Sequence, residues 1–162
     1  MNTKVGLDEP TSPWKATPPK DDRGYFERMT THIFSAGLNW QVVEKKKAGF
    51  KEAFSGYSPE MVARYTERDV KRLMSNTGIV RNERKIRSTI HNAAQFQLIK
   101  KDYGSFGGYL AKFGKREKEL QADLQNRFQH MGASTTRMFL WSIGYPLTPN
   151  AEEKKWMATH DV

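Results

Sequence analysis

The chain has 162 residues, which is enough for one domain with a single buried core. It contains no cysteine, so disulfides, thiolate zinc sites and cysteine nucleophiles are excluded. Its 27 Lys and Arg residues outnumber 18 Asp and Glu residues, and the net charge of +9 would attract nucleic acid, an anionic membrane surface or an acidic protein. No apolar run approaches the ~20 residues that span a bilayer, and the start of the chain lacks the apolar middle of a signal peptide, so we expect a cytoplasmic protein.

Proline dominates the beginning of the chain. Proline lacks a backbone N–H donor and disfavours helix in the residue before it. Residues 1–20, which contain Pro10, Pro13, Pro18 and Pro19, are therefore predicted to form an extended arm. Trp14 lies within this arm, and a side chain of its size is expected to dock on the rest of the protein.

From residue 21 onward, apolar residues recur at helical spacing between clear helix-start signals. Asp21 or Asp22 can cap a first helix, and Pro59 stands at the first position of a short one. Thr66 and Asp69 fit a capping box. The predicted helices cover residues 21–35, 39–54, 58–65, 66–74, 82–103, 105–113, 115–131, 134–143 and 151–160.

Strand patterns are nearly absent, so the predicted fold class is all-α, an orthogonal helical bundle. We expect an extended arm at 1–20, one helical domain at 21–146, and a tail at 147–162 that carries a short helix. In the long helix, the predicted buried stripe consists of Ile86, Ile90, Ala93, Ala94 and Leu98.

The segment from Asp69 to Asn92 reads as helix, tight turn, helix, with Gly78 in the turn. A glycine there permits a positive φ and lets a phosphate approach the backbone closely. The free N–H groups of the next helix, which begins near Asn82, favour an anion at the same place. An ordinary helical corner with a solvated basic face is the alternative. The candidate contacts to a DNA backbone are Gly78, Ile79, Val80, Arg81, Arg84 and Lys85.

Five segments of the chain match the sequence pattern of a known protein family. They are Ser35–Trp40 (SAGLNW), the lysine run at 45–47, Tyr57–Asn92, YGSFGGYL from Tyr103, and Phe128–Gly144. Over roughly residues 20–146, the chain resembles the DNA-3-methyladenine glycosylase I family. The resemblance implies the helix-hairpin-helix glycosylase fold, with the Gly78 hairpin as its DNA-binding element. It also implies hydrolysis of the N-glycosidic bond of alkylated bases such as 3-methyladenine, after the base is flipped from the duplex.

The resemblance assigns base-binding roles to aromatic residues. Trp40 matches the family's pocket tryptophan, and an aromatic ring can bind a cationic alkylated base by stacking and cation–π attraction. Trp14 lies close to where the family has another pocket tryptophan, and Tyr25 can add aromatic surface. The alternatives are that Trp40 is a core aromatic and that Tyr25 is an amphipathic residue at a helix edge.

His32 stands where the family has a glutamate, eight residues before the pocket tryptophan. Because that glutamate hydrogen-bonds the flipped base, the resemblance places His32 in the catalytic position. A neutral imidazole can accept a hydrogen bond from an exocyclic amine, whereas a protonated one would repel a cationic base. A partly buried structural histidine is the alternative.

The N-terminal part of the family pattern is missing from this chain, both its YHDxEWG motif and its zinc site of two Cys and two His. The four histidines, at positions 32, 91, 130 and 160, have no metal-ligand spacing. We therefore expect no metal and no cofactor.

Two functions fit these features. The first is a base-excision repair glycosylase, acting as a monomer on double-stranded DNA with alkylated bases, associated with the nucleoid and not with a membrane. Its choice of lesion could differ from the family's, because the pocket residues are the ones that changed. The second is a non-catalytic helix-hairpin-helix DNA-binding protein with a degenerate base pocket.

Overall fold

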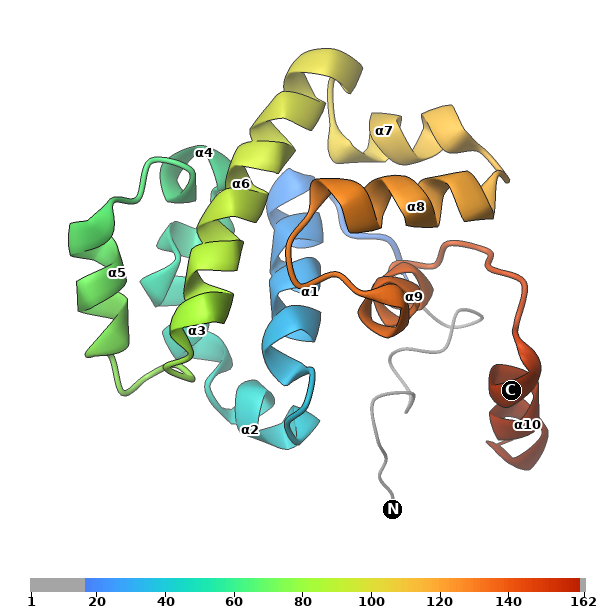
Figure 1. Cartoon of the computed structure of the whole chain (residues 1–162), viewed down its shortest axis with the longest axis horizontal. Helices are drawn as coiled ribbons and strands as arrows, with labels where there is room; N and C mark the ends of the chain where they lie inside the picture. The colour runs from blue at the N-terminus through green and yellow to red at the C-terminus, as the bar shows by residue number, and fades with distance from the viewer. Residues whose placement is uncertain (1–16, 161–162) are drawn as a thin grey trace.

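The computed structural model describes residues 17–160, and every regular element in this range is a helix. The elements are α1 (Asp22–Ser35), α2 (Trp40–Lys45), α3 (Lys47–Ala53), the 3-10 turn η1 (Ser55–Tyr57), α4 (Pro59–Val62), α5 (Glu67–Met74), α6 (Glu83–Tyr103), α7 (Phe106–Phe113), α8 (Glu117–Arg127), α9 (Ala133–Ser142) and α10 (Ala151–His160). Figure 1 shows α1 and α6 upright, α7 and α8 lying across them, and α9 seen nearly end-on. The predicted all-α orthogonal bundle is confirmed. No helix of residues 17–160 is long and apolar enough to cross a membrane.

Helix α1 lies at the centre of the bundle and packs against α6, α7 and α9. Asp21 caps it as predicted, because its carboxylate accepts a hydrogen bond of 3.0 Å from the Gly24 amide. Phe26 is fully buried, and its ring lies 5.3 Å from that of Phe96 on α6. Phe96 in turn stacks at 4.8 Å on Phe106, the first residue of α7. These aromatic contacts join three helices in one core.

One predicted helix, 39–54, is wrong, because the chain leaves helical geometry at Lys46 (φ −102°, ψ 14°) and forms α2 and α3 instead. The reason lies in the hairpin turn that α3 contacts. A Cβ atom on Gly49 would lie only 2.2 Å from the carbonyl oxygen of Gly78. Lys46 adds a hydrogen bond of 2.9 Å from its ammonium group to the carbonyl oxygen of Thr77. The interruption therefore lets α3 meet the turn at backbone distance.

The buried face of α6 also differs from the predicted stripe. Leu98 is 48% exposed, whereas Phe96 and Ile99 are fully buried. At 3.6 residues per turn, the observed buried face is rotated by about a third of a turn from the predicted one. The apolar pattern of the sequence did not reveal this buried face, because polar residues form part of it. Thr89 and Asn92 are buried there, and their side chains form hydrogen bonds with backbone atoms.

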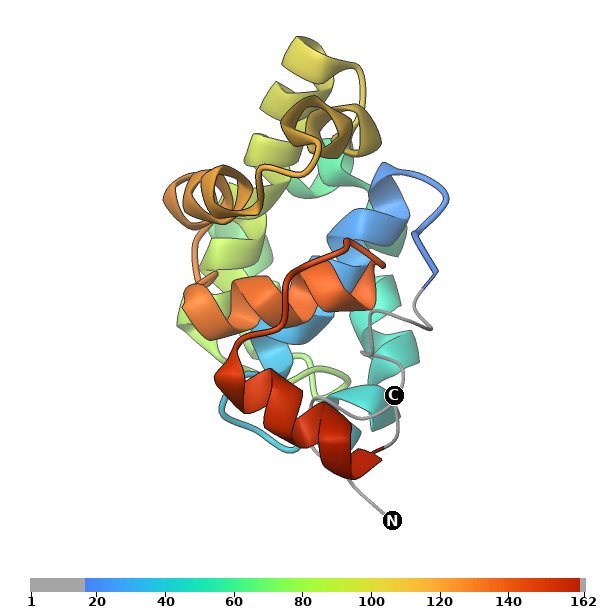
Figure 2. The ribbon, with the colours of Figure 1, turned by 90° about the vertical axis from the view of Figure 1, so that its right-hand side faces the viewer.

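Local start signals were confirmed at other helices. The capping box at Thr66 and Asp69 is present, with a hydrogen bond of 2.8 Å from the Thr66 amide to the Asp69 carboxylate. Helix α8 ends at Arg127, four residues before the predicted end, because the following loop turns back onto α6. Helix α10 begins and ends as predicted, and Figure 2 shows it below α9 in that view.

Candidate functional site

The helix-hairpin-helix element consists of α5, a tight turn and α6. The side chain of Asn76 accepts a hydrogen bond of 2.7 Å from the Gly78 amide, and the Ile79 side chain is buried in the core. Asn82 caps α6 by accepting a hydrogen bond of 3.0 Å from the Lys85 amide. The turn is therefore held by its own side chains at both ends.

Gly78 does not adopt the positive φ that its position in the turn suggested. Positive φ is found at other described glycines, such as Gly37, but not at Gly78. An added Cβ on Gly78 would crowd the Asn76 side-chain oxygen, at 3.0 Å, whereas Cα of Gly49 would lie at an ordinary contact distance of 3.6 Å. Glycine at 78 therefore leaves room for the Asn76 side chain that holds the turn, and the close approach of α3 depends on Gly49.

The cations near the hairpin fall into two groups. Arg81 and Arg84 are exposed, and neither has a hydrogen-bond or ion-pair partner among residues 17–160. Arg87, by contrast, donates hydrogen bonds of 2.7 and 2.8 Å to Glu67 and one of 2.9 Å to Glu83. Arg81 and Arg84 are thus the cations beside the turn that are available to an anion.

Lys85 departs from the sequence expectation that it faces a DNA backbone. Its side chain is buried, and its ammonium group donates to the carbonyl oxygens of Ala36 (2.7 Å) and Phe34 (3.3 Å). Burial lowers the pKa of this ammonium group. Lys85 therefore caps the C-terminal end of α1 and joins it to the first turn of α6.

Directly after that end of α1, a short turn leads into α2 and brings His32 and Trp40 together. Gly37 adopts a left-handed backbone (φ 79°), and Asn39 caps α2 with a hydrogen bond of 2.8 Å from the Gln41 amide. The ring of His32 then lies 5.5 Å from that of Trp40, at an interplanar angle of 46°. The two residues that the resemblance assigned to the base pocket are neighbours.

His32 is enclosed by the fold. The side chain is 2% exposed, and neither ring nitrogen has a hydrogen-bond partner among residues 17–160. Burial, with a smaller contribution from the nearby Arg28 charge, lowers the pKa of His32 to about 3. The imidazole is therefore neutral at physiological pH.

A cleft of about 590 Å³ opens between α1, α2, α3 and η1, and Trp40 forms part of its wall. The other residues that line it are Pro19, Lys20, Asp21, Arg23, Gly24, Glu27, Arg28, Thr31, Val43, Glu44, Lys47, Phe50, Lys51, Gly56 and Tyr57. His32 and Tyr25 are not among them. Tyr25 is instead packed on Phe106, with ring centroids 4.9 Å apart, and Trp14 lies outside the described residues.

Two residues near Trp40 were missed by the sequence reasoning. Leu38 is a large apolar side chain that is 45% exposed in the turn before α2. Its signal was present in the sequence, because an apolar residue stands between Gly37 and Asn39 in a turn. Tyr57 lines the cleft although its position after a glycine carried no such signal.

Residues 17–160 contain no group of three or more His, Cys, Asp or Glu side chains that could hold a metal ion.

Comparison with known proteins gives this geometry a context. The sequence pattern of the methyladenine glycosylase family matches residues 12–139. The chain is 29% identical over 96 residues to DNA-3-methyladenine glycosylase of Haemophilus influenzae, covering 59% of this chain and 52% of that protein. It is also 29% identical over 103 residues to DNA-3-methyladenine glycosylase 1 of Escherichia coli, covering 64% and 55%. The chain thus spans about half the length of these curated relatives.

Solved structures superimpose on a larger part of this chain than the curated relatives match in sequence. The 3-methyladenine DNA glycosylase I of Staphylococcus aureus superimposes with a TM-score of 0.74 at 25% identity, covering 89% of this chain and 87% of that one. A variant 3-methyladenine DNA glycosylase I in complex with 3-methyladenine gives 0.73 at 27% identity, covering 85% and 87%. From its sequence match over 12–139 and this shared fold, the chain belongs to the methyladenine glycosylase family.

Proposed function

We propose that the protein is a DNA glycosylase, which hydrolyses the N-glycosidic bond of alkylated bases such as 3-methyladenine in double-stranded DNA. The observation that carries the proposal is that one residue, Lys85, links the hairpin to the candidate base site. Lys85 joins the hairpin helix α6 to the end of α1, directly before the turn that leads to Trp40. The names of the relatives support the same reaction. The hairpin, Trp40 and His32 come from a single chain, so the proposal requires only a monomer.

Trp40 is proposed to stack on the flipped base. An adenine alkylated at ring nitrogen N3 in DNA carries a positive charge, and an indole face attracts a cation. The same charge makes the base a good leaving group, so the reaction does not require strong acid catalysis. The site needs an aromatic wall, a hydrogen-bond partner for the base edge, and access for a water molecule.

His32 is proposed to supply that hydrogen bond. Its depressed pKa keeps the imidazole neutral, so it does not repel a cationic base. Both of its buried nitrogens are unpaired among residues 17–160, and an unpaired buried polar group destabilises a protein by about 1–3 kcal/mol. A base edge that reached His32 would remove this penalty, so part of the binding energy would come from satisfying the imidazole.

Leu38 is proposed to fill the gap that the flipped base leaves. Enzymes that extrude a base must replace its lost stacking, and apolar side chains inserted between base steps do this. Leu38 is exposed and lies two residues before Trp40. The hairpin would meanwhile hold the backbone, irrespective of sequence, through Arg81 and through amides other than that of Gly78, which already donates to Asn76.

The second candidate function is a non-catalytic DNA-binding protein. The observation that favours it is that His32, in the position of the family's glutamate, is enclosed and does not line the cleft beside Trp40. DNA binding through the hairpin would be the same in both cases, so only excision separates the two functions.

The decisive experiment measures free 3-methyladenine released from methylated duplex DNA. We expect release by the wild type and a loss of about tenfold or more in Trp40→Ala and His32→Ala, because each removes one contact to the base. Leu98→Ala, an exposed position on α6, is the matched control and should excise normally. Duplex binding without release of 3-methyladenine by the wild type would rule out excision of this base and leave excision of another lesion or the non-catalytic function.

A further inference from the structure

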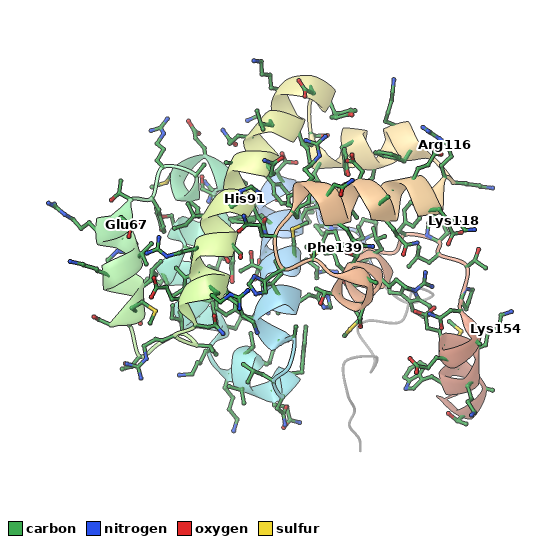
Figure 3. The ribbon with its side chains drawn as sticks, in the orientation of Figure 1. Glu67, His91, Arg116, Lys118, Phe139 and Lys154 are labelled. Carbon is green, nitrogen blue, oxygen red and sulfur yellow. The ribbon has the colours of Figure 1, made fainter. Side chains whose placement is uncertain are left out.

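A second pocket lies between α6 and the loop that joins α8 to α9. It has a volume of about 540 Å³ and is lined by Arg84, Arg87, Ser88, Gln129 and His130. The first three belong to α6, and the last two to the loop between α8 and α9. His91, labelled in Figure 3, lies on the next turn of α6 and marks the position of this loop.

Three neighbouring side chains of α6 hold the loop in place. Asn92 donates to the carbonyl oxygen of Gln129 (3.1 Å) and accepts from the Gln129 amide (2.8 Å). The His91 ring lies 3.2 Å from the carbonyl oxygen of Arg127. Ser88, which is buried, shares a hydrogen bond of 2.7 Å with Nδ1 of His130. The loop is therefore a fixed part of the α6 surface.

His130 is held in an unusual conformation within this loop. Its backbone is left-handed (φ 60°), which is uncommon for a residue other than glycine. The ring is exposed although Nδ1 is bound by Ser88. When the imidazole is protonated, Nδ1–H bonds to Ser88 and Nε2–H is left to donate to an anion. The conformation thus presents one donor of a charged histidine to the pocket.

The charges in this pocket are uneven. Arg87 is neutralised by Glu67 and Glu83, whereas Arg84 has no carboxylate partner among residues 17–160. Within the pocket, Arg84 is therefore the cation whose charge is not balanced. A rise of 1.5 Å per residue places Ser88 about 8 Å along α6 from its first residue, beyond the phosphate that the hairpin amides can reach.

We propose that Arg84, Ser88 and His130 form a second phosphate-binding site, which takes a DNA backbone phosphate other than the one at the hairpin turn. The inference rests on the proposed function, because it assigns the pocket to the same duplex. Arg84 supplies a permanent charge and His130 a second donor, which Ser88 orients. The loop between α8 and α9 thereby becomes part of the DNA-binding surface.

The electrostatics of the empty pocket agree with this role. Burial, followed by the charges of Arg84 and Lys85, lowers the pKa of His130. Arg87, the third cation near the ring, is balanced by its two carboxylates. A phosphate would reverse the effect of these cations and raise the pKa of the imidazole. Binding should therefore be stronger at lower pH.

The test compares the affinity of the full chain for an undamaged duplex as a function of salt. We expect Arg84→Gln to weaken binding about three- to tenfold and to reduce the salt slope by about 1. His130→Asn, chosen because Asn tolerates a left-handed backbone, should weaken binding about threefold at pH 6 and less at pH 8. Lys154→Gln removes the same charge from exposed α10, labelled in Figure 3, and should change neither quantity.

An NMR titration of the His130 ring identifies the anion. A rise in its pKa on adding the duplex supports the inference. A rise with inorganic phosphate, while both variants bind the duplex as Lys154→Gln does, would show a site for free phosphate and overturn it. If both variants bind normally and the wild type still excises 3-methyladenine, this inference fails alone. If the wild type binds no duplex, the inference fails together with the proposed function.

Discussion

At the scale of single residues, His32 stands where the resemblance places a glutamate of the family. A carboxylate there would attract a cationic base directly, whereas a neutral imidazole offers only a hydrogen bond. The fold compensates by keeping the imidazole uncharged, since burial and Arg28 both lower its pKa. The residue therefore avoids repulsion without supplying attraction, which leaves Trp40 as the main contact to the positive charge.

The buried, neutral state of His32 makes the stability of the protein depend on pH. The pKa of the group is about 3 in the folded state and near 6.5 when unfolded. Between these pH values the unfolded chain binds more protons than the folded chain. The contribution of neutral His32 to the free energy of unfolding is therefore fully present above pH 6.5 and is lost as the pH falls. At 1.36 kcal/mol per pKa unit, the free energy of unfolding should fall by about 3 kcal/mol between pH 7 and pH 4 from this residue alone.

The variant His32→Phe isolates this contribution, because it keeps an aromatic ring but cannot be protonated. Urea unfolding of both proteins at a series of pH values gives the difference in their free energies of unfolding. We expect that difference to change by about 3 kcal/mol in favour of the variant on acidification from pH 7 to pH 4. Acidic residues that titrate in both proteins cancel. Parallel curves would mean that His32 is accessible to protons in the folded state.

At the scale of elements, the sequence predicted the structural features that depend on residues close together in the chain. The capping of α1 by Asp21 and the capping box of α5 involve atoms three residues apart, so their patterns were readable. The pairing of His32 with Trp40 was accessible for the same reason, since one short turn separates them. The division into α2 and α3 was not, because it depends on Gly78, which is distant from Gly49 in the sequence.

The same limit applies to Lys85 in the candidate site. From the sequence, it is one of several cations after the hairpin. In the fold, it bonds to a carbonyl oxygen 49 residues away, at the end of α1. Only the packing of α6 on α1 distinguishes it from Arg84, which stays exposed. Charge patterns in the sequence locate a basic surface, but they do not show which of its cations already form hydrogen bonds within the protein.

The contact between α3 and the hairpin turn predicts a specific sensitivity at Gly49. In Gly49→Ala the new methyl group would lie 2.2 Å from the Gly78 carbonyl oxygen, a backbone atom that cannot rotate away. We expect the variant to lose about 1–3 kcal/mol of stability and to bind duplex DNA more weakly, because the turn must move. Thermal unfolding and duplex titration measure the two effects.

Gly107 provides the matched control, since it also lies in a helix. A Cβ there would have an ordinary contact at 3.8 Å, with the Ser105 hydroxyl. Gly107→Ala should therefore leave stability unchanged or raise it by up to about 1 kcal/mol. Equal behaviour of the two variants would show that α3 and the turn are not in close contact.

At the scale of the whole molecule, two charged side chains, Lys85 and Arg137, connect separate helices by hydrogen bonds. Lys85 joins α6 to α1 near the candidate base site, and Arg137 on α9 joins the C-terminal helix α10 through Glu153. The Arg137–Glu153 pair attaches α10 to α9.

This pair has the geometry of a strong attachment. Arg137 donates two hydrogen bonds to Glu153, of 2.8 and 2.5 Å, and a third of 2.9 Å to the Thr148 carbonyl oxygen. Both side chains of the pair are largely buried. Burial alone would raise the pKa of Glu153, but the hydrogen bonds from Arg137 and from the Asn150 amide outweigh it and hold the pKa below its usual value. The attachment is thus present above about pH 4.5 and weakens as the pH falls through the lowered pKa.

Removing the carboxylate in Glu153→Ala should release α10, because Arg137 would be left partly buried without its partner. We expect a loss of about 2–3 kcal/mol and rapid proteolytic cleavage between α9 and α10, identified by mass spectrometry of the fragments. Glu152→Ala changes the neighbouring, exposed carboxylate of the same helix and should be cleaved as slowly as the wild type. Cleavage of both variants at the same rate would show that α10 is held by its apolar contacts and that the ion pair contributes little.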